Sequence, residues 1–194
     1  MDWQATLNDP RIVGGTAAAA LLLLALAWTW HRRRRRDPRQ RLQGAVLDLL
    51  EGIMVPDGED GELHIEFALL TPTGVTLLDL RDVEGHVFGS NAMQDWTVLA
   101  ERRRFTFANP QHAMLDRVAA VRRLLPGVEV SGLVTFTSRA RFTKGLPEHV
   151  VLLDDLIDEL QRNRGEPEAP GLRDAWDRLR REAVAAQVGR LMED

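Results

Sequence analysis

The stretch HIEFALLTPTGVTLLDLR, residues 64–81, decides the fold of this chain. Apolar and polar residues alternate from Leu63 to Leu70, which is typical of a half-buried β-strand. The sequence Thr-Pro-Thr-Gly at 71–74 predicts a tight turn, and 75–82 predicts a second strand beside the first. The first candidates for a functional site are charged side chains within these strands, namely Glu66, Asp79 and Arg81.

Further helices and strands are predicted on both sides of this hairpin. Residues 40–53 have the amphipathic spacing of a helix, and PDGEDGE at 56–62 is a turn-rich loop. Asn109-Pro110 is expected to open a helix that ends near Leu125, because proline suits a first helical turn. The β-branched run 128–137 indicates a buried strand. The other expected elements are short strands at 86–88, 96–99, 103–107 and 149–153 and a helix at 154–162.

This order of elements indicates an α/β or α+β domain over residues 40–163, with a mixed central sheet flanked by helices. Residues 164–171 include GEPEAPG, a composition typical of a linker. An amphipathic C-terminal helix is expected over 172–194. Its apolar face either packs back on the domain or binds a protein partner.

An uncharged run of 19 residues, 12–30, predicts one transmembrane helix before the domain. At ~1.5 Å per residue it would span roughly 28 Å, close to the ~30 Å hydrocarbon core of a bilayer. The basic segment 31–39 follows, and its arginines Arg32 to Arg36 mark the cytoplasmic side and favour anionic lipid. We therefore expect the N-terminal tail, 1–11, outside the cell (inner) membrane and the domain in the cytoplasm.

Composition narrows the classes of function. The chain has no cysteine, which excludes disulfides, cysteine-ligated zinc and a thiol nucleophile. From residue 37 onward it carries 19 basic and 27 acidic residues, a net charge of −8. An acidic domain is a poor general binder of nucleic acid, because such binding depends on neutralising phosphates. Local basic clusters could still contact DNA or RNA, and the candidate residues are Arg102, Arg103, Arg104, Arg141 and Lys144.

Four segments in this order resemble the nuclease-related domain (NERD) family. They are the loop at 56–62, HIEFALLTPTGVTLLDLRDVEGHVFGS at 64–90, FANPQHAMLDRVAAVRRLL at 107–125 and VSGLVTFTSRARF at 130–142. The resemblance covers roughly residues 44–160. It implies a restriction-endonuclease-like PD-(D/E)xK fold, and members of that family often carry a transmembrane segment.

The resemblance also implies a site on the two central strands. The acid of the family's first motif aligns with Glu66, and its acid-x-lysine pair aligns with Asp79 and Arg81. Two carboxylates on adjacent strands could hold Mg²⁺ or Mn²⁺, which would activate a water molecule for phosphodiester hydrolysis. Arginine at the lysine position can contact a phosphate but does not release its proton. A further acid and a glutamine of the family pattern align with Ala45 and Ala113, so every charged position is substituted or lost.

Three interpretations of Glu66, Asp79 and Arg81 are open from the sequence. They are ordinary charges at strand ends, a metal site without activity, or a working nuclease with Glu66 and Asp79 as metal ligands and Arg81 at the scissile phosphate. His64 shares the predicted face of Glu66 and is a further candidate ligand. A degenerate site would make the domain a nucleic-acid-related or regulatory module. The C-terminal helix would instead make it a membrane-tethered interaction module.

Overall fold

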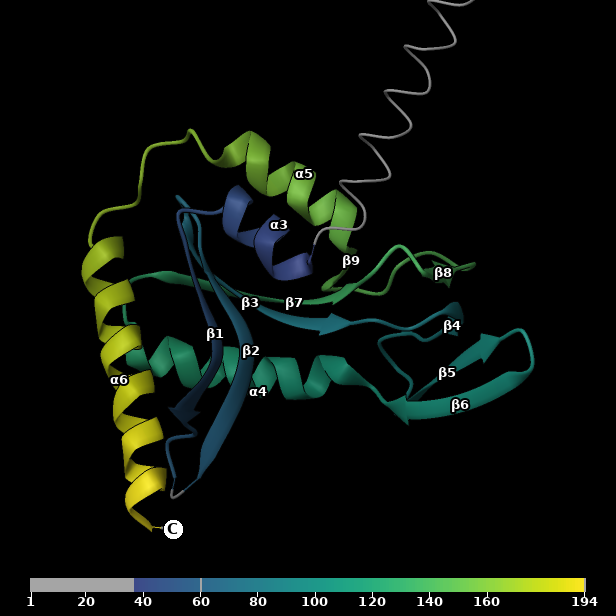
Figure 1. The fold of residues 1–194 in the computed structure, drawn as a ribbon, viewed down its shortest axis with the longest axis horizontal. Helices are drawn as coiled ribbons and strands as arrows, with labels where there is room; N and C mark the ends of the chain where they lie inside the picture. The colour runs from purple at the N-terminus through teal and green to yellow at the C-terminus, as the bar shows by residue number, and fades with distance from the viewer. Residues whose placement is uncertain (1–36, 60, 194) are drawn as a thin grey trace, which may run out of the picture. The chain divides into compact units, whose positions relative to one another are not determined.

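The structure, a computed structural model, describes residues 37–59 and 61–193. Residues from Arg41 onward form one compact unit. The described residues form two β-sheets and four helices (Figure 1). The predicted transmembrane helix at 12–30 lies outside the described residues. Within them, no helix is long and apolar enough to span a membrane.

Five strands form the larger sheet, in the order β1 (Asp48–Pro56), β2 (Glu62–Leu70), β3 (Gly74–Arg81), β7 (Glu129–Phe136) and β9 (Val150–Leu152). The first three strands pair antiparallel, and β3, β7 and β9 pair parallel, so the sheet is mixed. The predicted hairpin is confirmed as β2 and β3. It lies inside the sheet, where its side chains meet helices on both faces.

The predicted helix at 40–53 is wrong in its second half. Helix α3 (Pro38–Ala45) has only eight residues, and the chain then enters β1. Gly52 has a φ of +61°, a left-handed conformation that an α-helix does not contain. The apolar residues that suggested one helix face include Leu49 and Leu50, which pack into clusters on opposite faces of the sheet. Pairing with β2 therefore overrides the local helical pattern.

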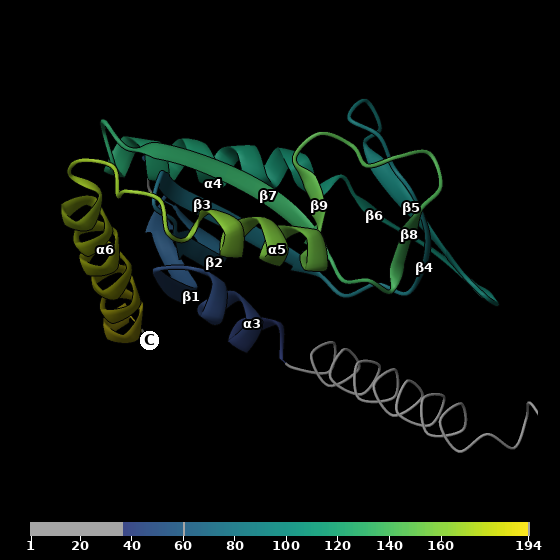
Figure 2. The ribbon, with the colours of Figure 1, turned by 90° about the horizontal axis from the view of Figure 1, so that it is seen from above.

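Helices cover both faces of the larger sheet (Figure 2). On one face lies α4 (Pro110–Leu124), whose side chains join the larger core cluster. On the other face, α3 and α5 (Leu153–Asn163) share a second apolar cluster with β2 and β3. Gly132 of β7 permits the close approach of α4, because a Cβ there would lie 2.5 Å from Val118 Cγ2. The prediction of a mixed sheet flanked by helices is confirmed.

The short strands form a second sheet, which corrects the prediction of one central sheet. Its order is β6 (Arg103–Ala108), β5 (Asp95–Ala100), β4 (Gly85–Phe88) and β8 (Ala140–Phe142). Strand β8 was not predicted; its sequence Ala-Arg-Phe contains no β-branched residue. Trp96 of β5 is fully buried, and its ring stacks 6.2 Å from that of Phe136 on β7. The two sheets thus share one core.

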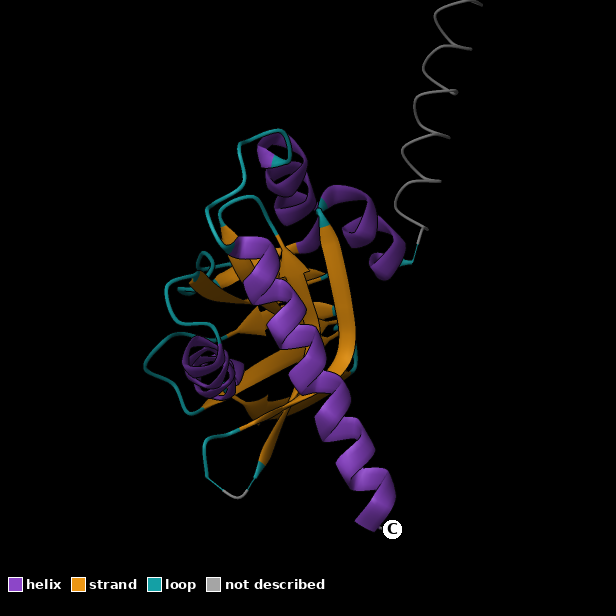
Figure 3. Cartoon of the chain, turned by 90° about the vertical axis from the view of Figure 1, so that its left-hand side faces the viewer, coloured by secondary structure: helices purple, strands orange, loops and turns teal. Residues whose placement is uncertain are grey.

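The C-terminal helix α6 (Leu172–Glu193) packs against β1 at the edge of the larger sheet (Figure 3). Its apolar face is buried up to Ala183. Trp176 Nε1 donates a hydrogen bond to Asp48 Oδ2 at 2.9 Å, and Arg180 donates to the same oxygen at 2.5 Å. Of the two interpretations of this helix, packing against its own domain is the one observed over these residues.

Candidate functional site

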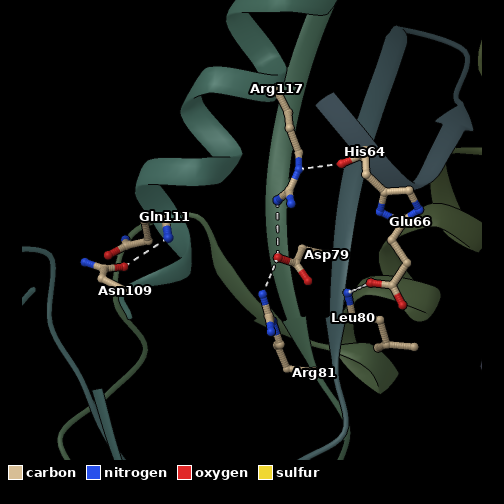
Figure 4. A network of polar contacts seen from close by, with 8 residues as sticks. All are labelled: His64, Glu66, Asp79, Leu80, Arg81, Asn109, Gln111 and Arg117. Carbon is tan, nitrogen blue, oxygen red and sulfur yellow. Dashed lines mark hydrogen bonds and ion pairs between the residues drawn. The ribbon is translucent and has the colours of Figure 1, made fainter. Parts of the chain in front are cut away.

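The candidate site lies where strands β2 and β3 separate (Figure 4). Their antiparallel ladder ends at the pair of Phe67 and Leu78. Beyond that pair, the Leu80 N–H donates to Glu66 Oε2 at 2.6 Å. The carboxylate of Glu66 therefore reaches across from β2 to β3 and accepts a hydrogen bond that a backbone carbonyl accepts elsewhere in the ladder.

Asp79 is neutralised from two sides. Its side chain is 10% exposed and lies on the face of β3 that α4 covers. Arg81, two residues further along the strand, donates to Asp79 Oδ2 at 2.8 Å. Arg117 of α4 donates to the same oxygen at 3.4 Å. Figure 4 shows the carboxylate of Asp79 between these two guanidinium groups, while Glu66 turns toward Leu80.

Arg117 is the site residue that sequence reasoning missed. Its Nε donates to the backbone oxygen of His64 at 2.7 Å, so one guanidinium joins the end of the β2 ladder to Asp79. A signal was present in the sequence. Arg117 follows Met114 by three residues and precedes Val121 by four, which places it on the apolar face of the predicted helix. A charge on such a face needs a partner once the helix packs.

The two carboxylates lie within electrostatic reach of each other. Burial is the main cause that raises the pKa of the Glu66 carboxyl, and the negative charge of Asp79 raises that pKa further. The hydrogen bond from Leu80 and the charges of Arg81 and His64 oppose this rise without cancelling it. The structure therefore pairs Asp79 with Arg81, while Glu66 is bonded to Leu80. A joint catalytic or metal-binding role for the three residues stays a prediction.

These residues do not fit a divalent metal ion as they are arranged. Magnesium and manganese prefer several oxygen ligands, and a cationic partner on the same oxygen competes with the metal. Asp79 Oδ2 already accepts from two guanidinium groups, and Glu66 Oε2 accepts from Leu80. In the part of the chain that the structure describes, no three His, Asp or Glu side chains are grouped so that they could hold a metal ion.

A second polar network lies at the amino end of α4. Asn109 caps the helix and accepts a hydrogen bond from the Gln111 N–H at 3.0 Å. The Gln111 amide, 8% exposed, donates to Glu148 O at 2.6 Å and to Asn91 Oδ1 at 3.0 Å. These bonds attach α4 to two loops that connect strands. Ala113, where the alignment placed the family's glutamine, is exposed, so the buried amide beside Asn-Pro is that of Gln111.

The residues predicted to contact nucleic acid lie on the second sheet and in its turns. Asp79 belongs to the larger sheet. All five side chains are exposed, and none forms a hydrogen bond or ion pair with another residue that the structure describes. They are Arg102 in the turn between β5 and β6, Arg103 and Arg104 in β6, Arg141 in β8, and Lys144 in the turn after β8.

Comparison with protein families agrees with the resemblance seen in the sequence. The model of a family described as nuclease-related domain matches residues 39–137, which is 99 of the 194 residues. The matched span contains Glu66, Asp79, Arg81 and Arg117. No curated protein and no solved structure matches the chain.

Proposed function

The chain belongs to the nuclease-related domain (NERD) family, and from this premise we propose that it is a membrane-tethered nucleic-acid-binding module without phosphodiesterase activity. One observation carries the proposal. The Asp79 carboxylate, which a metal-dependent nuclease of this type would need as a ligand, is engaged by Arg81 and Arg117. The domain then keeps the strands and helix of a nuclease-related site in a structural role.

Arginine makes this pairing persistent. A metal ion at Asp79 Oδ2 would compete with two guanidinium groups that already donate to this oxygen. A guanidinium group differs from the amine of lysine in that it does not release its proton in a protein. The proposed ground state of the site is therefore a closed ion-pair network.

A cleavage and binding assay tests the proposal. The full chain, in micelles of a neutral detergent, is incubated with single- and double-stranded DNA and RNA in the presence of Mg²⁺ or Mn²⁺, beside the variant Asp79→Ala. The matched control is Asp116→Ala, which removes an exposed carboxylate of α4. We expect no cleavage by any of the three proteins, and oligonucleotide binding by all of them.

A metal-dependent nuclease is the second candidate, and the electrostatic proximity of Glu66 and Asp79 favours it. In that case Glu66 and Asp79 would be metal ligands and Arg81 would contact the scissile phosphate. Cleavage by the unmodified chain and by Asp116→Ala, lost in Asp79→Ala, would establish this candidate and overturn the first. A circular dichroism spectrum identical among the three proteins would exclude misfolding as the cause.

We also propose that residues 12–30 anchor the chain in the cell (inner) membrane with the domain in the cytoplasm. The support comes from the sequence, namely the uncharged run and the five arginines at 32–36. Because the chain has no cysteine, single thiols introduced by Asn8→Cys or Thr143→Cys can be labelled with a membrane-impermeant maleimide on intact spheroplasts. We expect labelling at position 8 only. Labelling at position 143 only would show the opposite topology. Extraction of the protein from the membrane by carbonate would exclude the anchor.

A protein partner of the C-terminal helix stays a prediction. Burial of the apolar face of α6 up to Ala183 leaves less of that face for a partner than the sequence suggested. Deleting residues 166–194 tests it by pull-down. Retention of every bound protein by the shortened chain would contradict a role for this helix in partner binding.

A further inference from the structure

The second sheet has one face that none of the four described helices covers. The strand register aligns four side chains across it, because Arg104 pairs with Leu99, Leu99 with His86, and His86 with Arg141. Residues directly opposite each other in paired strands point to the same face of a sheet. All four side chains are exposed. We call these residues the cross-strand row.

A second row lies beside it on the same face. Phe88 of β4 pairs with Thr97 of β5, which pairs with Thr106 of β6. Of the residues between the two rows, Val87 and Val98 point the other way and are buried in the core, whereas Phe105 of β6 is exposed. The uncovered face therefore carries arginine, histidine, threonine, leucine and phenylalanine, and neither row contains an acidic residue.

The cross-strand row borders a cavity of about 730 Å³. This volume is within the range of roughly 300–1,000 Å³ that is usual for ligand sites. His86, Leu99 and Arg141 of the row line the cavity. The other side chains that contribute charge or a hydroxyl to its lining are Arg102, Arg103, Arg139, Ser138, Glu84 and Glu101.

Part of the positive charge on this surface has no ion-pair partner among residues 37–59 and 61–193. Arg139 forms ion pairs with Asp82 at 3.1 Å and with Glu84 at 2.9 Å. By contrast, the side chains of four exposed arginines form no ion pair or hydrogen bond with any residue that the structure describes: Arg102, Arg103, Arg104 and Arg141. On a domain with a net negative charge, such a group forms a local attractive field for a polyanion.

We propose that this open face binds single-stranded nucleic acid. Arg104 and Arg141 stand three strand spacings apart, roughly 14 Å at ~4.8 Å per spacing, so they can contact phosphates at separate points along one strand. Arg102 adds a contact from the turn of the β5–β6 hairpin, where it lines the cavity. The rings of His86 and Phe88 lie between the arginines and offer flat surfaces on which bases can stack. The inference rests on the proposed function and locates its binding surface.

The composition of the face favours a single strand over two other polyanions. A duplex presents its phosphates but hides the base faces, so His86, Leu99 and Phe88 would have no partner there. A lipid surface is held by apolar side chains that enter the acyl region together with basic ones. Leu99, 43% exposed, is the exposed aliphatic side chain of the two rows, and one such residue is too little for insertion.

Fluorescence anisotropy tests this surface with the full chain in neutral detergent micelles and a labelled mixed-sequence strand of about 12 nucleotides, as DNA and as RNA. The test variant is Arg104→Glu with Arg141→Glu. The matched control is Arg162→Glu with Arg181→Glu, which changes the net charge equally at exposed positions of α5 and α6. We expect at least a tenfold weaker affinity for the test variant, and a salt slope smaller by about 1.4, since each phosphate contact contributes about 0.7.

A gain-of-affinity variant separates binding from folding. Leu99→Lys adds a cation in the middle of the cross-strand row, and Leu115→Lys adds one at a position of α4 that is 56% exposed. We expect several-fold tighter binding for Leu99→Lys alone, a result that an unfolded protein would not produce. Equal affinities for Leu99→Lys, Leu115→Lys and the unmodified chain would contradict binding at the cross-strand row.

The outcomes distinguish the two proposals. If binding of the single-stranded oligonucleotide were equally weakened, or equally retained, in the test and control double variants, the cross-strand row would not be the binding surface. The proposed nucleic-acid-binding function would still stand. No binding of any strand by the unmodified chain would overturn both. Binding of a duplex as tight as that of the single strand, or binding of phosphatidylserine vesicles without strand binding, would overturn the assignment to single strands.

Discussion

Two charged side chains satisfy backbone groups where β2 and β3 separate. Arg117 Nε donates to His64 O, and Glu66 Oε2 accepts from the Leu80 N–H. Backbone groups that leave a ladder need partners of this kind, because an unpaired buried N–H or C=O costs about as much as a lost hydrogen bond. Glu66, which the resemblance associates with catalysis, thus has a structural use in this chain.

Glu66→Gln is expected to stabilise the protein near neutral pH. The raised pKa of Glu66 means that the folded state binds the proton more tightly than the unfolded state does. The protonated carboxyl therefore contributes stability below the ordinary pKa of 4.5, and this contribution is lost as the pH rises through the higher folded pKa. Glutamine keeps an oxygen for the Leu80 N–H and carries no charge. Urea unfolding should show a higher midpoint than for the unmodified chain at about pH 7 and no difference below pH 4.5.

The control for this substitution is Glu159→Gln, at an exposed position of α5. Its unfolding midpoint should follow that of the unmodified chain at both pH values. A lower midpoint for Glu66→Gln at neutral pH would contradict the account, because it would mean that the ionised carboxylate stabilises the fold.

At the scale of elements, α6 depends on one carboxylate of β1. Burial by itself would raise the pKa of Asp48, but hydrogen bonds from Trp176, Leu49 and Arg180, together with the charge of Arg180, outweigh it and lower the pKa. The side chain of Trp176 is buried while its Nε1–H is satisfied by Asp48. Helix and strand are therefore joined by an apolar contact and a charge-assisted network.

Acid should weaken the docking of α6. Because the folded pKa of Asp48 is lowered, its contribution to stability is present above the ordinary value of 3.8 and is lost as the pH falls through the folded value. In Asp48→Asn, we expect faster hydrogen exchange of the α6 amides at neutral pH. The protection of these amides should also change less with pH below 4 than it does in the unmodified chain. Asp116→Asn is the control. Unchanged α6 exchange in Asp48→Asn at neutral pH would contradict this role.

At the scale of the whole molecule, Trp96 holds the two sheets together. Its ring lies 6.1 to 6.4 Å from the rings of Phe107, Phe136 and Phe142, which come from both sheets. Gly89 faces this ring, and a Cβ there would lie 2.3 Å from it. Such a shared core predicts that the sheets unfold together.

Trp96→Ala is expected to destabilise the protein by about 3–5 kcal/mol, because it leaves a large cavity in a closed core. Hydrogen exchange should lose protection in both sheets, and far-UV circular dichroism should show one transition in urea. Leu115→Ala, at an exposed position, should stay within about 0.5 kcal/mol of the unmodified chain. If the second sheet alone lost protection in Trp96→Ala, the two sheets would be separate folding units.

Local patterns predicted much of the fold. The strands at 63–70 and 75–82, the helix from Pro110 and the strand at 128–137 were all found, because alternation and helical spacing are properties of near neighbours. The segment 40–53 failed for the same reason. Its apolar residues satisfy the spacing of a helix face, and they equally suit a strand that is buried on both sides.

The sequence by itself determined the β2–β3 hairpin, helix α4 and the position of Asp79 and Arg81 on one face of a strand, since these depend on periodicity among near neighbours. Only the tertiary structure decided that Arg117, 38 residues from Asp79, closes the site. It also decided that β4 pairs with β8, which creates the cross-strand row from residues more than fifty positions apart. Such contacts follow from the packing of the whole chain, because no local pattern specifies which distant strand becomes a neighbour.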